Sequence, residues 1–139
     1  MKYLFLVLGF LFCSASLKAQ DIIGSVKRGP YLIAELSIKA RDTTNFYKLR
    51  FLDPSSEILK SIEFHCSEKQ LEELYIFFKD MLTKKNGTSN NIQVGKYTFN
   101  VTTQKMMGLR NLAIQINEDY HFGLNGKEID KLMNKNTNE

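Results

Sequence analysis

Three side chains have the chemistry to bind a soft metal ion or to form a cysteine nucleophile with its base: His65, Cys66 and His121. Zinc and copper sites use imidazole nitrogen and thiolate sulfur, and a catalytic cysteine needs a histidine beside it. His65 and Cys66 are adjacent, so in an extended strand they point to opposite faces of a sheet. We therefore predict no metal-binding, cofactor-binding or catalytic residues. The alternative hypothesis is a hydrolase or metal protein whose ligands meet only in the fold.

Paired carboxylates are the other groups that could do chemistry. They occur as Glu72 beside Glu73 and as Glu118 beside Asp119. Adjacent residues on a helix do not converge on one point, and acids beside a turn are usually solvated. The eight glycines are dispersed, so there is no Gly-rich phosphate-binding loop, and the chain has no Trp. These patterns predict that the protein is not an enzyme and carries no cofactor.

The first residues are typical of an export signal. Lys2 precedes an apolar run over residues 3–12 and a short segment of small and polar residues. The apolar run is too short to span a bilayer, which needs about 20 residues. We interpret residues 1–19 as a signal peptide cleaved after Ala19, with cleavage after Ala15 as the alternative. Lipid attachment at Cys13 is disfavoured because Phe12 is bulky. This predicts export to the periplasm, the outer surface or the medium.

Composition indicates one globular domain, because 43% of the 139 residues are hydrophobic and 24% are charged. Removal of Lys2 and Lys18 with the leader lowers the net charge from +4 to 4 − 2 = +2. So small an excess favours no nucleic-acid partner, and we expect an unknown protein or surface component. The exported chain keeps only Cys66, so it has no internal disulfide. We expect this cysteine to be buried packing rather than a reactive thiol or an intermolecular bridge.

Hydrophobic periodicity in the first half predicts four strands and a helix. Strands are expected at residues 21–27, 31–40, 46–52 and 58–65, and Leu32, Ala34, Leu36 and Ile38 give the second an apolar face. Ser67 and Gln70 form a capping pair at the start of a helix. Its apolar stripe should pack on the sheet that precedes it.

The second half predicts the same order of elements. Strand patterns occupy residues 92–103, 111–116 and 119–124. Asn125 can cap a second helix, with Glu128 as the reciprocal partner.

The two halves correspond at two places. Gly29, Tyr31 and Ile33 match Gly95, Tyr97 and Phe99 at an offset of 97 − 31 = 66, and Phe64, Lys69, Leu71 and Leu74 match Phe122, Lys127, Ile129 and Leu132 at 122 − 64 = 58. The prediction is an α+β fold of antiparallel β-meanders, each followed by a helix. It forms one domain over residues 20–135, with pseudo-symmetric ββββα-like repeat units at 22–85 and 92–134 packed together, and a frayed tail at 136–139. The alternative is that any capped helix after a strand would look alike.

The chain resembles a group of short, uncharacterised exported bacterial proteins. The resemblance rests on a leader ending in Ala19 and Gln20, on the strand residues Tyr47, Leu49, Phe51 and Asp53, and on Lys127, Ile129, Asp130, Lys131 and Leu132. It implies export and no particular activity. In element order the chain also resembles PUR-type nucleic-acid-binding proteins, whose repeats place strands before a helix. The first hypothesis is a non-enzymatic binding module that acts through a sheet face or edge; the alternative is a nucleic-acid-binding module.

Overall fold

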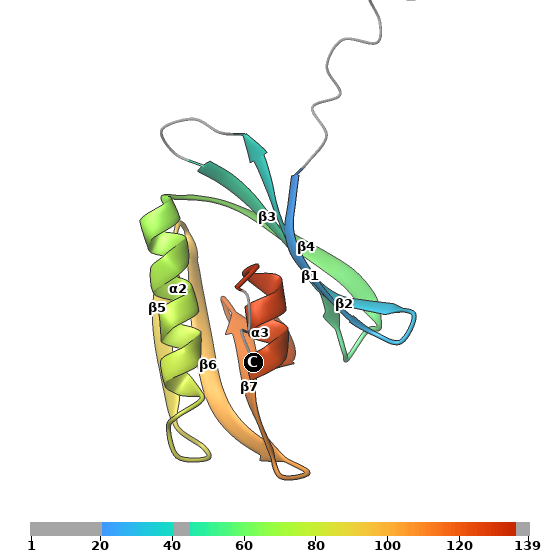
Figure 1. The fold of residues 1–139 in the computed structure, drawn as a ribbon, viewed down its shortest axis with the longest axis vertical. Helices are drawn as coiled ribbons and strands as arrows, with labels where there is room; N and C mark the ends of the chain where they lie inside the picture. Colours follow the sequence, from blue (N-terminus) through green and yellow to red (C-terminus); the bar gives the residue numbers. More distant parts are fainter. Residues whose placement is uncertain (1–20, 41–44, 136–139) are drawn as a thin grey trace, which may run out of the picture.

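Two antiparallel four-stranded sheets, each followed by a helix, make up the protein (Figure 1). The computed structural model describes residues 21–40 and 45–135, so the predicted leader and the predicted frayed tail lie outside the described residues. The elements in chain order are β1 (Asp21–Arg28), β2 (Tyr31–Ala40), β3 (Asn45–Asp53), β4 (Ile58–Cys66), α2 (Glu68–Met81), β5 (Ser89–Val94), β6 (Tyr97–Met106), β7 (Leu109–Ile116), β8 (Tyr120–Asn125) and α3 (Gly126–Leu132). The predicted meanders with following helices are confirmed, in a chain that is predominantly β.

The first sheet has the order β1-β2-β3-β4 and follows the predicted alternation closely. On β3 the residues Tyr47, Leu49 and Phe51 are buried while their neighbours are half-buried. On β2 the expected apolar face is present, with Ala34 and Leu36 buried. Every second side chain of these strands therefore enters the core, as a pleated sheet with one covered face requires.

The second sheet has the order β5-β6-β7-β8, which corrects the prediction of a single strand over residues 92–103. Gly95 divides that segment into a hairpin, because its φ of 57° is one that residues with a side chain rarely adopt. A Cβ at this position would also lie 2.9 Å from the carbonyl oxygen of His65. The glycine thus permits both the β5–β6 turn and its close approach to β4.

The correspondence between Gly29 and Gly95 is confirmed as a shared hairpin turn, since both have positive φ and the next strands begin at Tyr31 and Tyr97. The inward face after the turn is offset by one residue, because Ala34 rather than Ile33 takes the fully buried place that Phe99 has in β6. A register shift at Val26 and Lys27 in the β1–β2 pair lies beside this turn. Such bulges change which residues face the core.

Both helices begin with the predicted capping box. Ser67 accepts a hydrogen bond from the amide of Gln70, and the Gln70 side chain accepts one from the Ser67 amide. Asn125 and Glu128 make the same two bonds at the start of α3. The two caps are 125 − 67 = 58 residues apart, which is the offset that the sequence comparison gave.

The helices do not pack where the sequence suggested. We expected α2 to cover the sheet that precedes it, but it packs mainly on β5 and β6 of the second sheet, and α3 packs on β1 of the first (Figure 1). The apolar stripe of α2 predicts that a sheet must be covered but does not specify which one. Because each unit supplies the helix for the other unit's sheet, the two units share one core.

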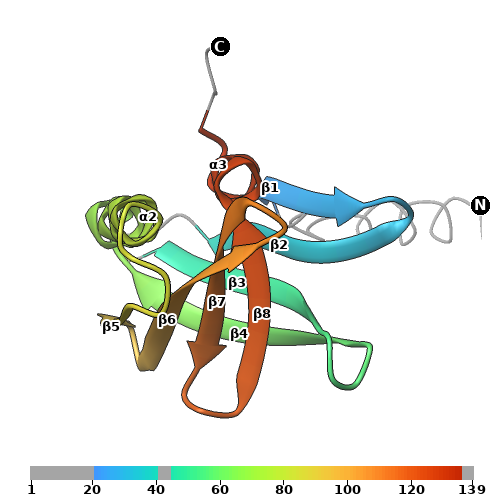
Figure 2. The same ribbon diagram turned by 90° about the horizontal axis from the view of Figure 1, so that it is seen from below.

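That core fills the space between the inner faces of the two sheets, whose strands run in different directions (Figure 2). Phe51 of β3 stacks on Phe122 of β8 with ring centroids 4.8 Å apart, which joins the sheets directly. Phe78 of α2 and Leu132 of α3 are both buried, so the stripes of the two helices face inward as predicted. Offset stacking of buried rings adds about 1 kcal/mol beyond the area they bury.

Helix α3 lies against β1 at a place where no side chain would fit. A Cβ on Gly24 would come within 2.1 Å of the carbonyl oxygen of Lys131 and 2.3 Å of that of Leu132. Arg28 at the end of β1 then holds the start of α3 through two hydrogen bonds to Glu128, at 2.7 and 2.8 Å. Burial disfavours the charged form of Glu128, but these bonds and the Asn125 amide outweigh it and lower the pKa of its carboxyl.

The other side of α3 is held by α2. Asp130 accepts a hydrogen bond of 2.9 Å from the Tyr75 hydroxyl and forms an ion pair with Lys79 at 3.1 Å. Burial, and then the Asp130 carboxylate, raise the pKa of Tyr75.

Among the described residues, no helix has the length and apolar character needed to cross a membrane.

Candidate functional site

The three candidate ligands for a soft metal ion, His65, Cys66 and His121, lie in different environments. His65 is exposed on the outer side of β4, Cys66 is buried on the inner side, and His121 is exposed on β8. The expectation that His65 and Cys66 face opposite ways is confirmed. Within residues 21–40 and 45–135, no group of three or more His, Cys, Asp and Glu side chains is placed to hold a metal ion.

Cys66 has the environment of a packing residue, as expected. It is a free cysteine with a buried side chain, and burial raises the pKa of its thiol to about 11. Because the thiolate is the reactive form, this thiol is almost fully protonated near neutral pH.

The carboxylate pairs are at the surface. Glu72 pairs with Lys135 and Glu73 pairs with Lys69, so each acid of the helix pair points to a different cation. Glu118 and Asp119 are exposed in the turn between β7 and β8. Neither pair therefore brings two carboxylates together on one point.

The outer face of the first sheet carries charges of both signs beside an aromatic pair. Rings of Phe46 and His65 are 4.5 Å apart, and the Lys39 ammonium lies 5.4 Å from the Phe46 ring centre. Lys39 also bonds Glu63, and this bond lowers the pKa of the Glu63 carboxyl. Two further ladder neighbours, Arg50 and Glu35, form an ion pair of 3.1 Å. Much of the positive charge on this face is thus neutralised locally.

The outer face of the second sheet is different, because the strand register places only uncharged residues there. These positions are Ser89, Asn91, Gln93, Thr98, Asn100, Thr102, Gln104, Asn111, Ala113, Gln115, His121, Gly123 and Asn125. None of these is Lys, Arg, Asp or Glu, and at the turn end of the β6–β7 hairpin the register continues this face with the apolar pair Met106 and Leu109. A quarter of the chain is charged, so a sheet face without any charge is unusual for this protein.

One row of this uncharged face crosses all four strands. The register pairs Asn91 with Asn100, Asn100 with Gln115, and Gln115 with His121. Neighbouring strands are about 4.8 Å apart, so the row presents polar groups at that spacing. Some members of the face are already engaged: the hydroxyls of Ser89 and Thr102 are 2.7 Å apart.

The amides of the row remain available to a ligand. The Gln115 side chain donates to the Glu118 carbonyl at 3.1 Å, which leaves its oxygen free to accept. Asn91 and Asn100 make no side-chain hydrogen bond to another residue in the part of the chain that the structure describes. Each Asn or Gln amide supplies two donor hydrogens and an acceptor oxygen. The face can therefore donate and accept hydrogen bonds without any charge.

A cavity of about 470 Å³ opens where the two units meet. Ile23, Ile38, Leu71 and Met133 contribute apolar surface to it, together with the rings of Tyr47 and Tyr75. At its rim Lys135 pairs with Glu72 and lies 5.2 Å from the Tyr75 ring centre. This base and acid neutralise each other across the junction of α2 with the end of α3. The cavity therefore marks the boundary between the units, and its chemistry selects no class of ligand as clearly as the uncharged face does.

Sequence reasoning missed the uncharged face, although its signal is present. The outward residues of β5 and β6 are all neutral and polar, over Ser89 to Gln93 and over Thr98 to Gln104, and most of the residues between them are apolar. Period-two alternation predicts the strands, and the shared neutrality of their outward residues is a second signal in the same pattern. No protein-family model, no curated protein and no solved structure matches the chain.

Proposed function

We propose that this protein is a non-enzymatic binding module that holds an uncharged polysaccharide against the outer face of its second sheet. The observation that carries the proposal is the four-strand row from Asn91 to His121 on a face with no charged residue. An exported location, which the leader predicts, would place this face among the glycans of a cell surface or of the medium.

The surface chemistry favours a glycan over the other macromolecules. Nucleic-acid binding depends on cations that neutralise phosphates and on aromatic rings that stack on bases, and this face has no Lys, Arg, Phe, Tyr or Trp and offers His121 as its one ring. Protein interfaces draw most of their affinity from buried Trp, Tyr and Arg anchors, which are also missing here. Sugar hydroxyls both donate and accept hydrogen bonds, so they complement amide groups that do the same.

The proposal is tested with the full chain by affinity electrophoresis in gels that contain dextran, mannan or xyloglucan. We expect retardation by at least one of these polymers, and the same retardation at low and high salt because no charge is involved. Replacing Asn100 and Gln115 together with Ala should weaken binding by about tenfold or more, since each lost hydrogen bond contributes about 1 kcal/mol. Lys48→Ala, on the outer face of the first sheet, is the matched control and should bind normally.

Two results would contradict the proposal. One is that none of the neutral polymers retards the protein, and the other is that the double variant binds as well as the original chain.

The second candidate is the nucleic-acid-binding module, with the outer face of the first sheet as its site. The observation that favours it is the Phe46–His65 ring pair with Lys39 over it and with Lys48 on the same face. Stacking rings beside cations is the arrangement that binds single strands. Against it, Lys39 and Arg50 are already paired with acids.

Fluorescence anisotropy with a labelled single-stranded oligonucleotide separates the two candidates. If the second candidate holds, Lys48→Ala weakens binding and reduces the salt dependence by about one phosphate contact, while Gln115→Ala changes nothing. The glycan proposal predicts the opposite ranking of the same two variants with polysaccharide.

We further propose that the two strand-and-helix units are pseudo-symmetric copies of one ββββα repeat. The equal caps at Ser67 and Asn125 and the equal hairpin turns at Gly29 and Gly95 support this. On this view the inner faces kept the shared core while the outer faces took on separate roles.

A further inference from the structure

The β6–β7 hairpin ends in a tip that is exposed and apolar. Met106, Met107 and Leu109 have exposed fractions of 57%, 102% and 65%, and they lie within four residues of each other. Large apolar side chains gathered at one exposed point mark interaction sites more often than scattered ones do.

The tip also breaks a rule of backbone conformation. Met107 and Gly108 form the two-residue loop of the hairpin, and both have positive φ, at 51° and 80°. Turns of this type favour Asn or Gly at the first of these positions, whereas an unbranched apolar residue there carries conformational strain. The corresponding turns of the first hairpin in each sheet place Gly29 and Gly95 at positive φ. Met107 is therefore unfavourable for the turn and is fully exposed, which indicates that it serves something other than folding.

Two cations, Lys105 and Arg110, lie beside the apolar tip. Lys105 and Arg110 are paired across the hairpin next to Met106 and Leu109. The Arg110 guanidinium donates to the carbonyls of Leu82 and Lys84 at 2.8 and 3.1 Å, which ties the loop after α2 to the hairpin.

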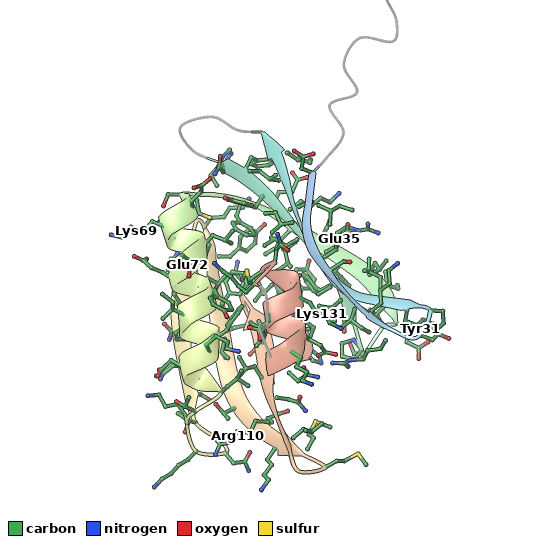
Figure 3. The ribbon with its side chains drawn as sticks, viewed as in Figure 1. Tyr31, Glu35, Lys69, Glu72, Arg110 and Lys131 are labelled. Atoms are coloured by element: carbon green, nitrogen blue, oxygen red, sulfur yellow. The ribbon has the colours of Figure 1, made fainter. Side chains whose placement is uncertain are left out.

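This loop adds further positive charge at the same end of the molecule. It contains Lys84 and Lys85, and Asn86 accepts a hydrogen bond of 3.0 Å from the Lys105 amide. The loop and the hairpin tip lie together at one end of the ribbon, with Arg110 between them (Figures 1 and 3). Residues 82–88 and 104–111 include no Asp or Glu; the nearby acid, Asp80, pairs with Lys84 at 3.3 Å.

We propose that this tip docks the protein on a membrane surface that contains anionic lipid, with the methionine and leucine side chains inserted among the acyl chains. The tip projects from the molecule, so it fits a deformable layer into which it can sink. Lys85, Lys105 and Arg110 then lie level with the headgroups, where each contributes about fivefold to the affinity, whereas Lys84 is already paired with Asp80. Flexible Met side chains adapt to such a layer more easily than rigid ones. This is peripheral binding at the end of the same sheet that carries the proposed glycan-binding face, because Met106 and Leu109 follow Gln104 and Asn111 in the strand register.

The chain has no Trp, so a single introduced Trp reports on the tip alone. In Leu109→Trp, mixing the full chain with vesicles of phosphatidylcholine and phosphatidylglycerol should shift the Trp emission to the blue and allow quenching by brominated lipid. Tyr31→Trp, at an exposed position in the β1–β2 hairpin, is the control and should show no shift. The apolar run of residues 3–12 is common to both variants, so it cannot produce a difference between them.

Two further variants test the mechanism in the Leu109→Trp background. Met107→Asn suits the positive φ and should leave the melting temperature unchanged or raised while it weakens vesicle binding severalfold. Lys85→Gln should weaken binding about fivefold, while Lys69→Gln at the other end of α2 should not (Figure 3). The proposal is overturned if Leu109→Trp shows no shift, if vesicles of phosphatidylcholine alone give the same shift, or if the tip binds polyglutamate but no vesicles.

Discussion

The two sheets have the same strand order and share one core, yet their outer faces differ completely. The first sheet presents Lys39, Lys48 and Arg50 among acids and rings, whereas the second presents hydroxyls and amides without a charge. The inner faces cannot diverge in this way, because each must match the other sheet and a helix in a close-packed interior. The chemistry of the two sheets therefore differs at the outward positions, where core packing does not restrict the choice of side chain.

The largest expected effect comes from comparing one glycine in each sheet. Gly24 lies against backbone atoms of α3, whereas Gly123 has room for a side chain. Gly24→Ala in the first sheet should lower the free energy of unfolding by about 3 kcal/mol, because its Cβ would overlap backbone oxygens of α3. Gly123→Ala in the second sheet places its Cβ 3.6 Å from the Leu112 oxygen, an ordinary contact, and should change stability little. Urea unfolding of both variants measures the contrast. Equal stability for the two would show that α3 does not lie on β1 as described.

The Arg28–Glu128 pair tests whether the first sheet depends on the second unit's helix. Arg28→Met should cost about 1 to 2 kcal/mol at neutral pH, since the Arg28 side chain is 53% exposed and solvent screens part of the pairing. The folded-state pKa of Glu128 is lowered, so the pair stabilises above the unfolded value near 4.5 and this contribution is lost as pH falls through the folded value.

The difference in unfolding free energy between the original chain and Arg28→Met should accordingly shrink below pH 4.5. A difference that stays constant on acidification would mean that the guanidinium acts only through its packing.

The two helix caps sharpen the comparison at a smaller scale. Ser67→Ala and Asn125→Ala should each cost about 1 kcal/mol, because each removes the acceptor for one amide of the first turn. The Asn125 change should cost more than the Ser67 change, since α3 has only seven residues and Glu128 also serves Arg28. Thermal unfolding of the pair gives the ranking, and the reverse order would indicate that α2 is the less secure of the two helices.

The smallest effects should come from the outer faces themselves. Lys48→Ala and Gln115→Ala should each change the free energy of unfolding by less than about 0.5 kcal/mol, as expected for surface positions that do not pack. Losses above 1 kcal/mol in chemical denaturation would mean that these residues are held for stability, and the contrast between the faces would lose its functional meaning.

Local patterns were enough to predict most elements of the fold. Strand alternation located β1 to β4, and the capping pairs at Ser67 and Asn125 fixed both helix starts to the residue. These features depend on neighbours within a few positions, so a single sequence contains them.

The placement of the helices could not be read in the same way. An apolar stripe such as that of Leu74 and Phe78 fits any apolar sheet. The exchange of helices between units depends on contacts of Gly24 and Arg28 with residues about a hundred positions away.

The candidate site could not be predicted from the sequence for a related reason. Its residues are neutral and individually ordinary, and only the strand register brings Asn91, Asn100 and Gln115 into one row.

The exchange of helices between the sheets sets an order on synthesis. β1 is synthesised about a hundred residues before α3, the seven-residue helix that packs on it. Until translation passes Leu132, β1 has no helix to pack against, so the edge of the first meander stays uncovered after the rest of both sheets has been made.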